Sequence, residues 1–356
     1  MNEMKISFTK LGGEECEKCE EFNLHDPNHK SDSLSDSCAI CQAWSMHMNR
    51  AREARERYRQ DAVGDTQSYN QRSVFSADLQ KVVMLPRLDM FKSVLFTRRI
   101  IAFNESFVPV GKQQSLKPLA VIWHEGIAGR KCEDIISAFH AFFTAYRDTA
   151  HIVLWLDNCA AQNKNWKSLS YLVYLINSDE TNTGTIELNY LEAGHTFMSA
   201  DSFHHQVEMS LKQSGKVYDF ADYETCVKNS NSGKTDVKAL TDFRDWLDCS
   251  STHKIRRMTP RPYLSGIVWF RAERGKFTVD YRTRFHEPEI TCNFLTATSC
   301  KRGIPTVHPR SMPRGIPTDK KEDILSKLSG IMPSMRLKFW QDMPTAAVSD
   351  LTTAHE

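Results

Sequence analysis

The chain has 356 residues, of which 40% are hydrophobic and 25% charged, and its 46 basic and 44 acidic side chains leave a formal net charge of +2. This length and composition are typical of globular protein with one large domain or two smaller ones, and the small net charge excludes a general polybasic attraction to nucleic acid. No apolar run approaches the roughly 18 residues of a membrane span, and the N-terminus lacks the apolar core of a signal peptide.

The N-terminal segment carries two Cys-x-x-Cys pairs, formed by Cys16 with Cys19 and by Cys38 with Cys41. Residues 20–37 separate the pairs, which is a spacing typical of a zinc site in which each pair supplies two ligands. The sequence therefore predicts a structural zinc site made by these four cysteines. Three histidines could each replace one cysteine, or be ordinary surface residues: His25, His29 and His47. The other six cysteines are scattered, which favours a reducing compartment.

A basic helix is expected next, over residues 42–61, because apolar residues recur there at helical spacing. Five arginines lie in it, and Glu53 and Arg57 form a favourable pair four residues apart. This helix is either a solvated, ion-paired face or a surface for phosphates. We assign residues 1–61 to a cysteine-rich head with this helix, and residues 62–72 to a linker.

The next part, residues 73–215, alternates between strand and helix patterns. We expect strands over 73–86, 91–103, 119–123, 152–156 and 186–191, and helices over 132–148, 166–176 and 201–212. The order is three strands, helix, strand, helix, strand, helix. It predicts an α/β fold with a mixed five-stranded sheet and helices on both faces.

Residues 216–343 are expected to form a C-terminal α/β extension that completes this core. The predicted parts are an irregular helical segment over 216–262, a hairpin within 266–281, a loop over 299–318 and a short helix capped by Thr318. The tail, residues 344–356, is predicted to be disordered.

Several acids of the core stand at positions where a carboxylate is costly to bury. Asp78 lies inside the first expected strand, Asp157 ends the apolar run of the fourth, and Asp201 and Glu208 lie on the last helix. The first and fourth strands should be neighbours, and ligands collect at the carboxyl ends of parallel strands. Each acid alone could be a turn or cap residue. Together they predict a two-metal site for Mg²⁺ or Mn²⁺.

Polar residues around these acids are candidates for DNA contact, although each also has a structural interpretation. Residues after the fourth strand could touch phosphates or cap the next helix. His195 could act as a general acid, contact DNA or make a structural hydrogen bond. Arg130 could hold a phosphate or pair with Glu133. The candidates are Asn158, Gln162, Asn163, Lys164, His195 and Arg130.

Beyond single residues, longer motifs carry a family resemblance. They are Glu15-Cys-Glu-Lys-Cys19, the helix of residues 47–61, Asp78-Leu-Gln-Lys-Val, residues 123–130, Leu156-Asp-Asn-Cys-Ala-Ala-Gln-Asn-Lys-Asn165, Gly194-His-Thr-Phe-Met-Ser-Ala-Asp-Ser-Phe-His-His-Gln-Val-Glu208, Lys320-Lys-Glu-Asp-Ile-Leu and Phe339-Trp. With these motifs the chain resembles transposase-derived proteins of animal genomes, which pair a cysteine-rich head with a ribonuclease H-like core. That core is the one found in DNA transposases and retroviral integrases. The likeness covers most of residues 15–345.

The resemblance implies metal-dependent DNA cleavage and strand transfer, with two Mg²⁺ or Mn²⁺ ions and a structural zinc. Asp78 and Asp157 would be the first two metal-binding acids, and either Asp201 or Glu208 the third, with Asp201 favoured. It also implies a nuclear protein that binds DNA, does not bind membranes and works as a homodimer.

The chain departs from a complete transposase in one respect. Only the cysteine-rich head and linker precede Asp78, without a separate helix-turn-helix module. A second hypothesis is therefore a domesticated, catalytically inactive DNA- or chromatin-binding protein on the same scaffold. A third, a zinc-dependent protein-interaction module, depends on residues 16–41 alone.

Overall fold

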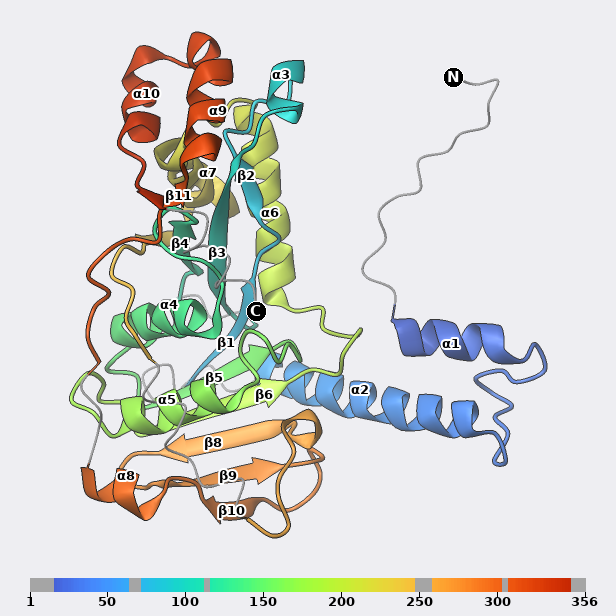
Figure 1. Cartoon of the computed structure of the whole chain (residues 1–356). Helices are drawn as coiled ribbons and strands as arrows, with labels where there is room; N and C mark the ends of the chain where they lie inside the picture. Colours follow the sequence, from blue (N-terminus) through green and yellow to red (C-terminus); the bar gives the residue numbers. More distant parts are fainter. Residues whose placement is uncertain (1–15, 64–71, 112–115, 247–257, 303–306, 347–356) are drawn as a thin grey trace.

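The computed structural model describes residues 16–63, 72–111, 116–246, 258–302 and 307–346. Its centre is a mixed ten-stranded sheet with helices on both faces (Figure 1). The strands of this sheet are β1 (Arg72–Leu79), β2 (Val83–Leu85), β3 (Ile100–Pro109), β4 (Leu119–His124), β5 (His151–Leu156), β6 (Thr185–Tyr190), β7 (Asp236–Ala239), β8 (Trp269–Glu273), β9 (Thr278–Arg282) and β10 (Ile290–Asn293). A separate small sheet pairs β11 (Ile316–Pro317) with β12 (Thr345–Ala346).

The helices lie before, between and after these strands. They are α1 (Glu17–His25), α2 (Ala39–Val63), α3 (Lys92–Leu95), α4 (Cys132–Ala145), α5 (Trp166–Ile176), α6 (Ser199–Ser214), α7 (Phe220–Gly233), α8 (Ala297–Arg302), α9 (Thr318–Leu328) and α10 (Ser334–Gln341). None of these described helices combines the length and the apolar composition that crossing a bilayer would require.

The strands of the large sheet run in the order β10-β9-β8-β6-β5-β1-β3-β4-β7, and β2 pairs with β3. β1 runs antiparallel to β3 and parallel to β5, and β5 runs parallel to β6. The first and fourth expected strands, β1 and β5, are thus neighbours at the middle of the sheet, as predicted. The sheet has ten strands instead of the expected five because β2, β7 and the C-terminal strands β8, β9 and β10 join it.

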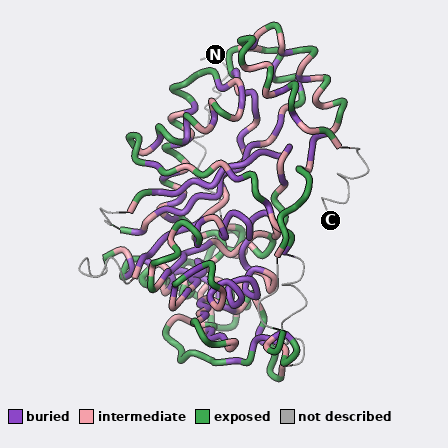
Figure 2. Tube along the Cα trace, turned by 90° about the vertical axis from the view of Figure 1, so that its left-hand side faces the viewer, coloured by how far each residue is buried: buried purple, intermediate pink, exposed green. Residues whose placement is uncertain are grey.

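Two apolar clusters cover the two faces of the sheet, because successive side chains of a strand point to opposite faces. Alternate residues of β1, β3 and β5 pack with α4 and α5 on one face. On the other face β3 and β4 pack with α6, α7, α9 and α10. Figure 2 shows the resulting pattern, with the buried trace inside and exposed segments along the outer helices.

The C-terminal half of α2 belongs to the core, while its other end reaches out to α1 (Figure 1). Ala54 and Tyr58 are buried against Val74 of β1 and Trp155 of β5, and the Tyr58 and Trp155 rings meet edge to face with their centroids 5.2 Å apart. The helix is longer than the predicted 42–61. It ends at Val63, inside the expected linker, and residues 64–71 lie outside the described part.

Most expected core elements are present within a few residues of their predicted ends, but several predictions were wrong. The expected irregular helical segment over 216–262 contains the strand β7 as well as α7, and the expected loop over 299–318 contains the end of α8 and the strand β11. The segment 73–86 is two strands, which places Asp78 next to the end of β1 and not in its interior. The expected strand over 91–103 holds α3 and only the start of β3, because Thr97 and the polar residues after it interrupt the run. Thr318 is the first residue of α9, and Pro317 occupies the cap position.

A further correction concerns the tail. Thr345 and Ala346 pair with β11, so the expected disorder does not begin at residue 344. Residues 347–356 lie outside the described part, as does much of the basic run within 254–261. The predicted hairpin is present as β8 and β9, joined across Gly275.

Buried histidines make the stability of this fold depend on pH. Burial lowers the pKa of His124, His140 and His204 to about 4 in each case, whereas an unfolded chain has a value of about 6.5. As the pH falls from 6.5 to 4 the unfolded state takes up protons first, so the folded state loses stability in this window. The loss approaches about 3 kcal/mol for each fully buried histidine.

We expect His124→Phe to flatten this dependence, because the ring of His124 contacts Phe220 and Phe339 and phenylalanine keeps an aromatic ring there without a titratable group. Urea unfolding at pH 7 and pH 4.5 measures the change. Zinc ligands also titrate in acid, so the informative quantity is the difference between the variant and the wild type. The exposed His205→Ala serves as the control, and equal slopes for all three proteins would contradict the prediction.

Candidate acidic and metal-binding sites

Asp78 and Asp157 lie next to each other at the carboxyl ends of the central strands β1 and β5. Ala77 and Leu156 are register partners in the parallel pair of β1 and β5, so the next residues of the two strands are Asp78 and Asp157. Because side chains alternate along a strand, both carboxylates point to the face that α6 covers. The neighbouring positions of the two strand ends agree with the sequence, and the metal-binding role of the two acids stays a prediction.

The loop after β5 holds the Asp157 carboxylate in place. Its Oδ1 accepts hydrogen bonds from the Cys159 backbone N–H at 3.2 Å and from Nδ2 of Asn163 at 2.8 Å. The next residue, Lys164, is buried over the ring of Tyr190 and donates to Oδ1 of Asn158 at 2.6 Å. Burial lowers the pKa of Lys164 to about 8. Asn163 and Lys164 therefore support the loop, and their side chains are covered by protein.

A third carboxylate, which the sequence analysis missed, lies near these two. Glu105 is fully buried in β3. Burial raises the pKa of Glu105 well above its ordinary value, and the nearby charges of Asp78 and Asp157 raise it further. The available signal was a glutamate between Asn104 and Ser106 inside an otherwise apolar strand. Phe103 and Phe107, two residues away on either side, pack on the face of α4 and α5, so Glu105 points to the opposite face from Asp78. Its raised pKa favours the neutral acid, so it is not a third charged ligand beside the two aspartates.

Helix α6 crosses the same face and brings His204 to Asp78. Nδ1 of His204 lies 3.6 Å from Oδ2 of Asp78, and the backbone N–H of Ala200 donates to Oγ of Ser76 at 3.0 Å. Asp201 and Glu208 are each one turn from His204 along the helix. Both have other partners. Asp201 accepts the backbone N–H of Met198 at 2.7 Å as part of the helix cap, and Glu208 forms two hydrogen bonds of 2.8 and 3.0 Å with the Arg87 guanidinium.

The remaining candidates for DNA contact differ in exposure. Arg130 is exposed, whereas Asn158 and Gln162 are half-buried in the loop beside Asp157. His195 lies away from these acids, on the loop between β6 and α6, where it contacts Cys19 of the head.

Arginines of α2 mostly have protein partners: Arg55 donates to the carbonyls of residues 195 and 197, and Arg57 lies 3.9 Å from Asp61. The predicted pair of Glu53 with Arg57 is replaced by contacts of Glu53 with Arg284 and His286.

The cysteine pairs are not brought together in one site. Within the described residues, potential ligand atoms gather within 4.8 Å of one another in two groups, each with two cysteines and two histidines. The members are Cys16, Cys19, His47 and His195 in the first group, and His25, His29, Cys38 and Cys41 in the second. Either group could hold a structural zinc ion. The single four-cysteine site was therefore wrong in its geometry, although all four cysteines lie in such groups.

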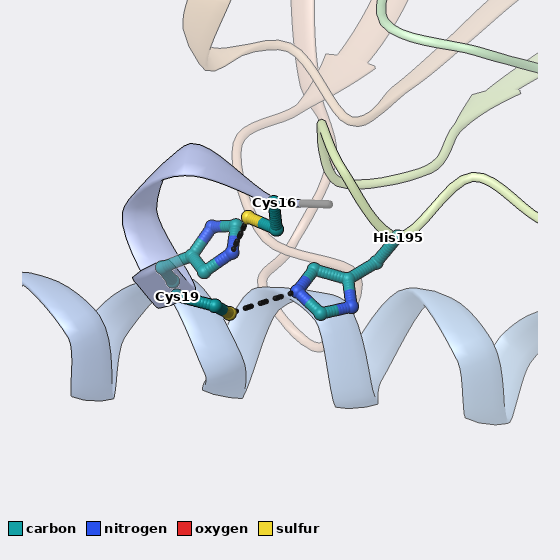
Figure 3. A group of neighbouring side chains, drawn as sticks. Cys16, Cys19 and His195 are labelled. Atoms are coloured by element: carbon teal, nitrogen blue, oxygen red, sulfur yellow. Dashed lines mark hydrogen bonds between the residues drawn. The ribbon is translucent and has the colours of Figure 1, made fainter. Parts of the chain in front are cut away.

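The first group joins segments far apart in the chain. Sγ of Cys16 lies 3.1 Å from Nε2 of His47, and Sγ of Cys19 lies 3.4 Å from Nε2 of His195. Figure 3 shows Cys16 and Cys19 at the start of α1, with Cys19 facing His195, which comes from the loop between β6 and α6. On its other side the His47 ring contacts Oε1 of Glu192 through Nδ1 at 2.9 Å.

The second group lies within the head. Nε2 of His25 is 3.5 Å from Sγ of Cys41 and 3.0 Å from Nδ1 of His29. Nδ1 of His25 contacts the carbonyl of Phe22. Cys38 directly precedes α2, and the backbone N–H of Cys41, with that of Ile40, lowers the pKa of the Cys38 thiol to about 7. Thiolate is the form that binds zinc, so this position favours metal binding.

Comparisons with known proteins give one match. A family model described as "Domain of unknown function (DUF7869)" matches residues 136–284, from α4 through β9. No curated protein matches the chain, and no solved structure matches it. The matched segment contains Asp157, His195, Asp201 and Glu208, but neither Asp78 nor the four head cysteines.

Proposed function

We propose that this chain is a transposase-like enzyme that cleaves and joins DNA with divalent metal ions on a ribonuclease H-like core. The observation that carries the proposal is the pairing of Asp78 and Asp157 on the central parallel strands β1 and β5. Two adjacent carboxylates repel each other when both are charged. A site of this kind is typical of carboxylates that share a cation.

The topology of the core supports the ribonuclease H-like assignment. Strands β1, β3 and β4 form an antiparallel meander, and β5 and β6 follow with intervening helices and run parallel to β1. Helix α6 then returns across the face on which both aspartates point, with His204 against Asp78. The third acid in the resemblance lies on this helix, so its placement agrees with the proposal.

The residues present fit Mg²⁺ or Mn²⁺, because carboxylate oxygens are the ligands these hard cations prefer. When bound, the ions would supply charge neutralisation for an in-line phosphoryl transfer. Asp78 and Asp157 would hold them, and Asp201 remains the favoured third ligand once its bond to the Met198 N–H is given up. His204, neutral because burial lowers its pKa to about 4, adds no positive charge to the site.

Asp78→Asn tests the proposal on the full chain. Wild-type protein with Mn²⁺ should nick or join a labelled DNA duplex, and chelation of the Mn²⁺ should stop the reaction. Asp78→Asn should be inactive, whereas Asp236→Asn, which changes an exposed aspartate at the start of β7, should keep the activity. If wild type and both variants are equally inert over many DNA ends with Mg²⁺ and Mn²⁺, the enzyme proposal fails.

A second candidate is a catalytically inactive DNA- or chromatin-binding protein on the same scaffold. This candidate is favoured because both possible third acids already bind protein groups instead of a metal ion. Asp201 caps its helix, and Glu208 is paired with Arg87. This alternative expects DNA binding in a gel-shift assay that is the same for wild type and Asp78→Asn, with no metal-dependent cleavage by either. In both cases nuclear localisation and self-association as a dimer are further proposals.

A further inference from the structure

We propose that the chain binds two zinc ions, and that the first one cross-links the N-terminal head to the core through His195. The ligands of this ion are Cys16, Cys19, His47 and His195. The second ion is held by the other group and involves the head alone. This arrangement gives the two metals different roles, one within the head and one between the head and the core.

Three sulfur-to-nitrogen distances in the two groups are close to those of a tetrahedral zinc site. With zinc–sulfur bonds of about 2.3 Å and zinc–nitrogen bonds of about 2.0 Å, sulfur and nitrogen ligands lie about 3.5 Å apart. The sulfur-to-nitrogen distances are 3.1 and 3.4 Å in the first group and 3.5 Å in the second. Two cysteines and two histidines are also a ligand set that closed structural zinc sites use.

Contacts outside the ligands orient the histidines for metal binding. A zinc-binding histidine usually donates its second ring N–H to a carboxylate or a carbonyl, which fixes the nitrogen that is free for the metal. His47 has Glu192 at Nδ1 and presents Nε2 to Cys16. His25 has the carbonyl of Phe22 at Nδ1 and presents Nε2 to Cys41. Since Glu192 belongs to the core, the core supplies both a ligand and a supporting carboxylate to the first site.

The close approach of head and core at this site depends on a glycine. Gly194, the residue before the ligand His195, has a φ of +76°, and a Cβ atom there would lie 2.7 Å from both Cβ and Sγ of Cys16. A larger residue would therefore push Cys16 away from the site. This is the packing expected where a ligand cysteine must approach a loop backbone.

The cross-link acts on the segment that leads into α6. Residues 191–198 connect β6 to α6. Within this connection, Arg55 of α2 donates to the carbonyls of residues 195 and 197 at 3.2 and 2.6 Å. At the start of α6 the Tyr58 hydroxyl lies 2.9 Å from Oγ of Ser199. The zinc ion would close a loop between residues 176 positions apart, Cys19 and His195, so it restricts the chain strongly.

Zinc stoichiometry of the full-length protein tests the proposal. We expect two zinc ions per chain in the wild type, one in His195→Ala and one in Cys38→Ser. His195→Cys, which restores a zinc-binding side chain, should return the count to two, and the matched control His205→Ala should keep it at two. One zinc in the wild type that His195→Ala leaves unchanged would overturn the proposal.

Hydrogen exchange separates the two roles and does not depend on any activity. Loss of the cross-link in His195→Ala should raise amide exchange in residues 193–198 by about tenfold or more, with His195→Cys close to the wild type. Cys38→Ser should leave exchange in this segment unchanged. If Cys38→Ser and His195→Ala accelerate exchange there equally, the first ion is not a cross-link between head and core.

Discussion

Asp157→Asn is expected to lower metal-dependent DNA cleavage by at least about 10²–10³-fold, with little change in the free energy of unfolding. The catalytic loss follows because asparagine carries no charge and is a weaker ligand for a hard cation. Single-turnover cleavage of a labelled duplex with saturating Mn²⁺ measures the rate, and urea unfolding measures the stability.

The fold should tolerate this change because asparagine keeps the acceptor that the loop uses. Oδ1 of residue 157 accepts the Cys159 N–H and the Asn163 side chain, and an amide oxygen accepts both bonds as well. Burial is the main cause of the raised pKa of Glu105, and removing the Asp157 charge takes away only a smaller contribution to it. Loss of activity counts as a catalytic effect only if Asp157→Asn is folded, so the unfolding measurement is made on the same preparation as the cleavage assay.

The same assay distinguishes the two candidates for the third acid. We expect Asp201→Asn to be inactive while its amide oxygen still caps α6. Glu208→Gln should stay active and lose at most about 1 kcal/mol, because its ion pair with Arg87 is partly exposed. The reverse pattern would assign Glu208 as the ligand. Full activity in both variants would contradict a three-acid site on this helix.

Asp61→Ala is expected to lower the free energy of unfolding by about 2–4 kcal/mol. Asp61 is buried at the end of α2, where Oδ1 lies 2.7 Å from the Arg72 guanidinium of β1 and Oδ2 accepts the indole N–H of Trp155 at 2.9 Å. Its loss leaves a buried indole donor without its acceptor and an arginine without its counter-ion. Because these partners lie on β1 and β5, the change loosens α2 from the centre of the sheet.

Two further variants show which contact matters. Asp61→Asn keeps an acceptor for Trp155 and removes the charge, so it should cost less than Asp61→Ala. Arg57→Ala is the matched control, because Arg57 is 43% exposed and 3.9 Å from Asp61, and it should change stability by less than about 0.5 kcal/mol. Equal effects of Arg57→Ala and Asp61→Ala in urea unfolding would contradict the buried network.

The sequence alone determined the main layers of this protein and the position of two acids. Apolar periodicity identified β5, α4, α5 and α6, because their buried faces are nearly continuous over whole elements. It also predicted that Asp157 would stand at a strand end beside the strand of Asp78, since parallel neighbours in such a sheet follow from the order of elements. The extra strands were missed because β2, β7 and β10 are short.

Tertiary structure alone decided which residues share a metal group. The spacing of the cysteine pairs suggested one site, but their positions at the starts of α1 and α2 direct each pair to different histidines. His195 and Glu192 lie far along the chain, and no local pattern connects them to Cys16. Likewise, the closeness of Glu105 to Asp78 follows only from the pairing of β3 with β1. Local patterns specify the elements, whereas long-range contacts specify the sites, because ligands from distant segments meet only after the sheet and α2 have packed.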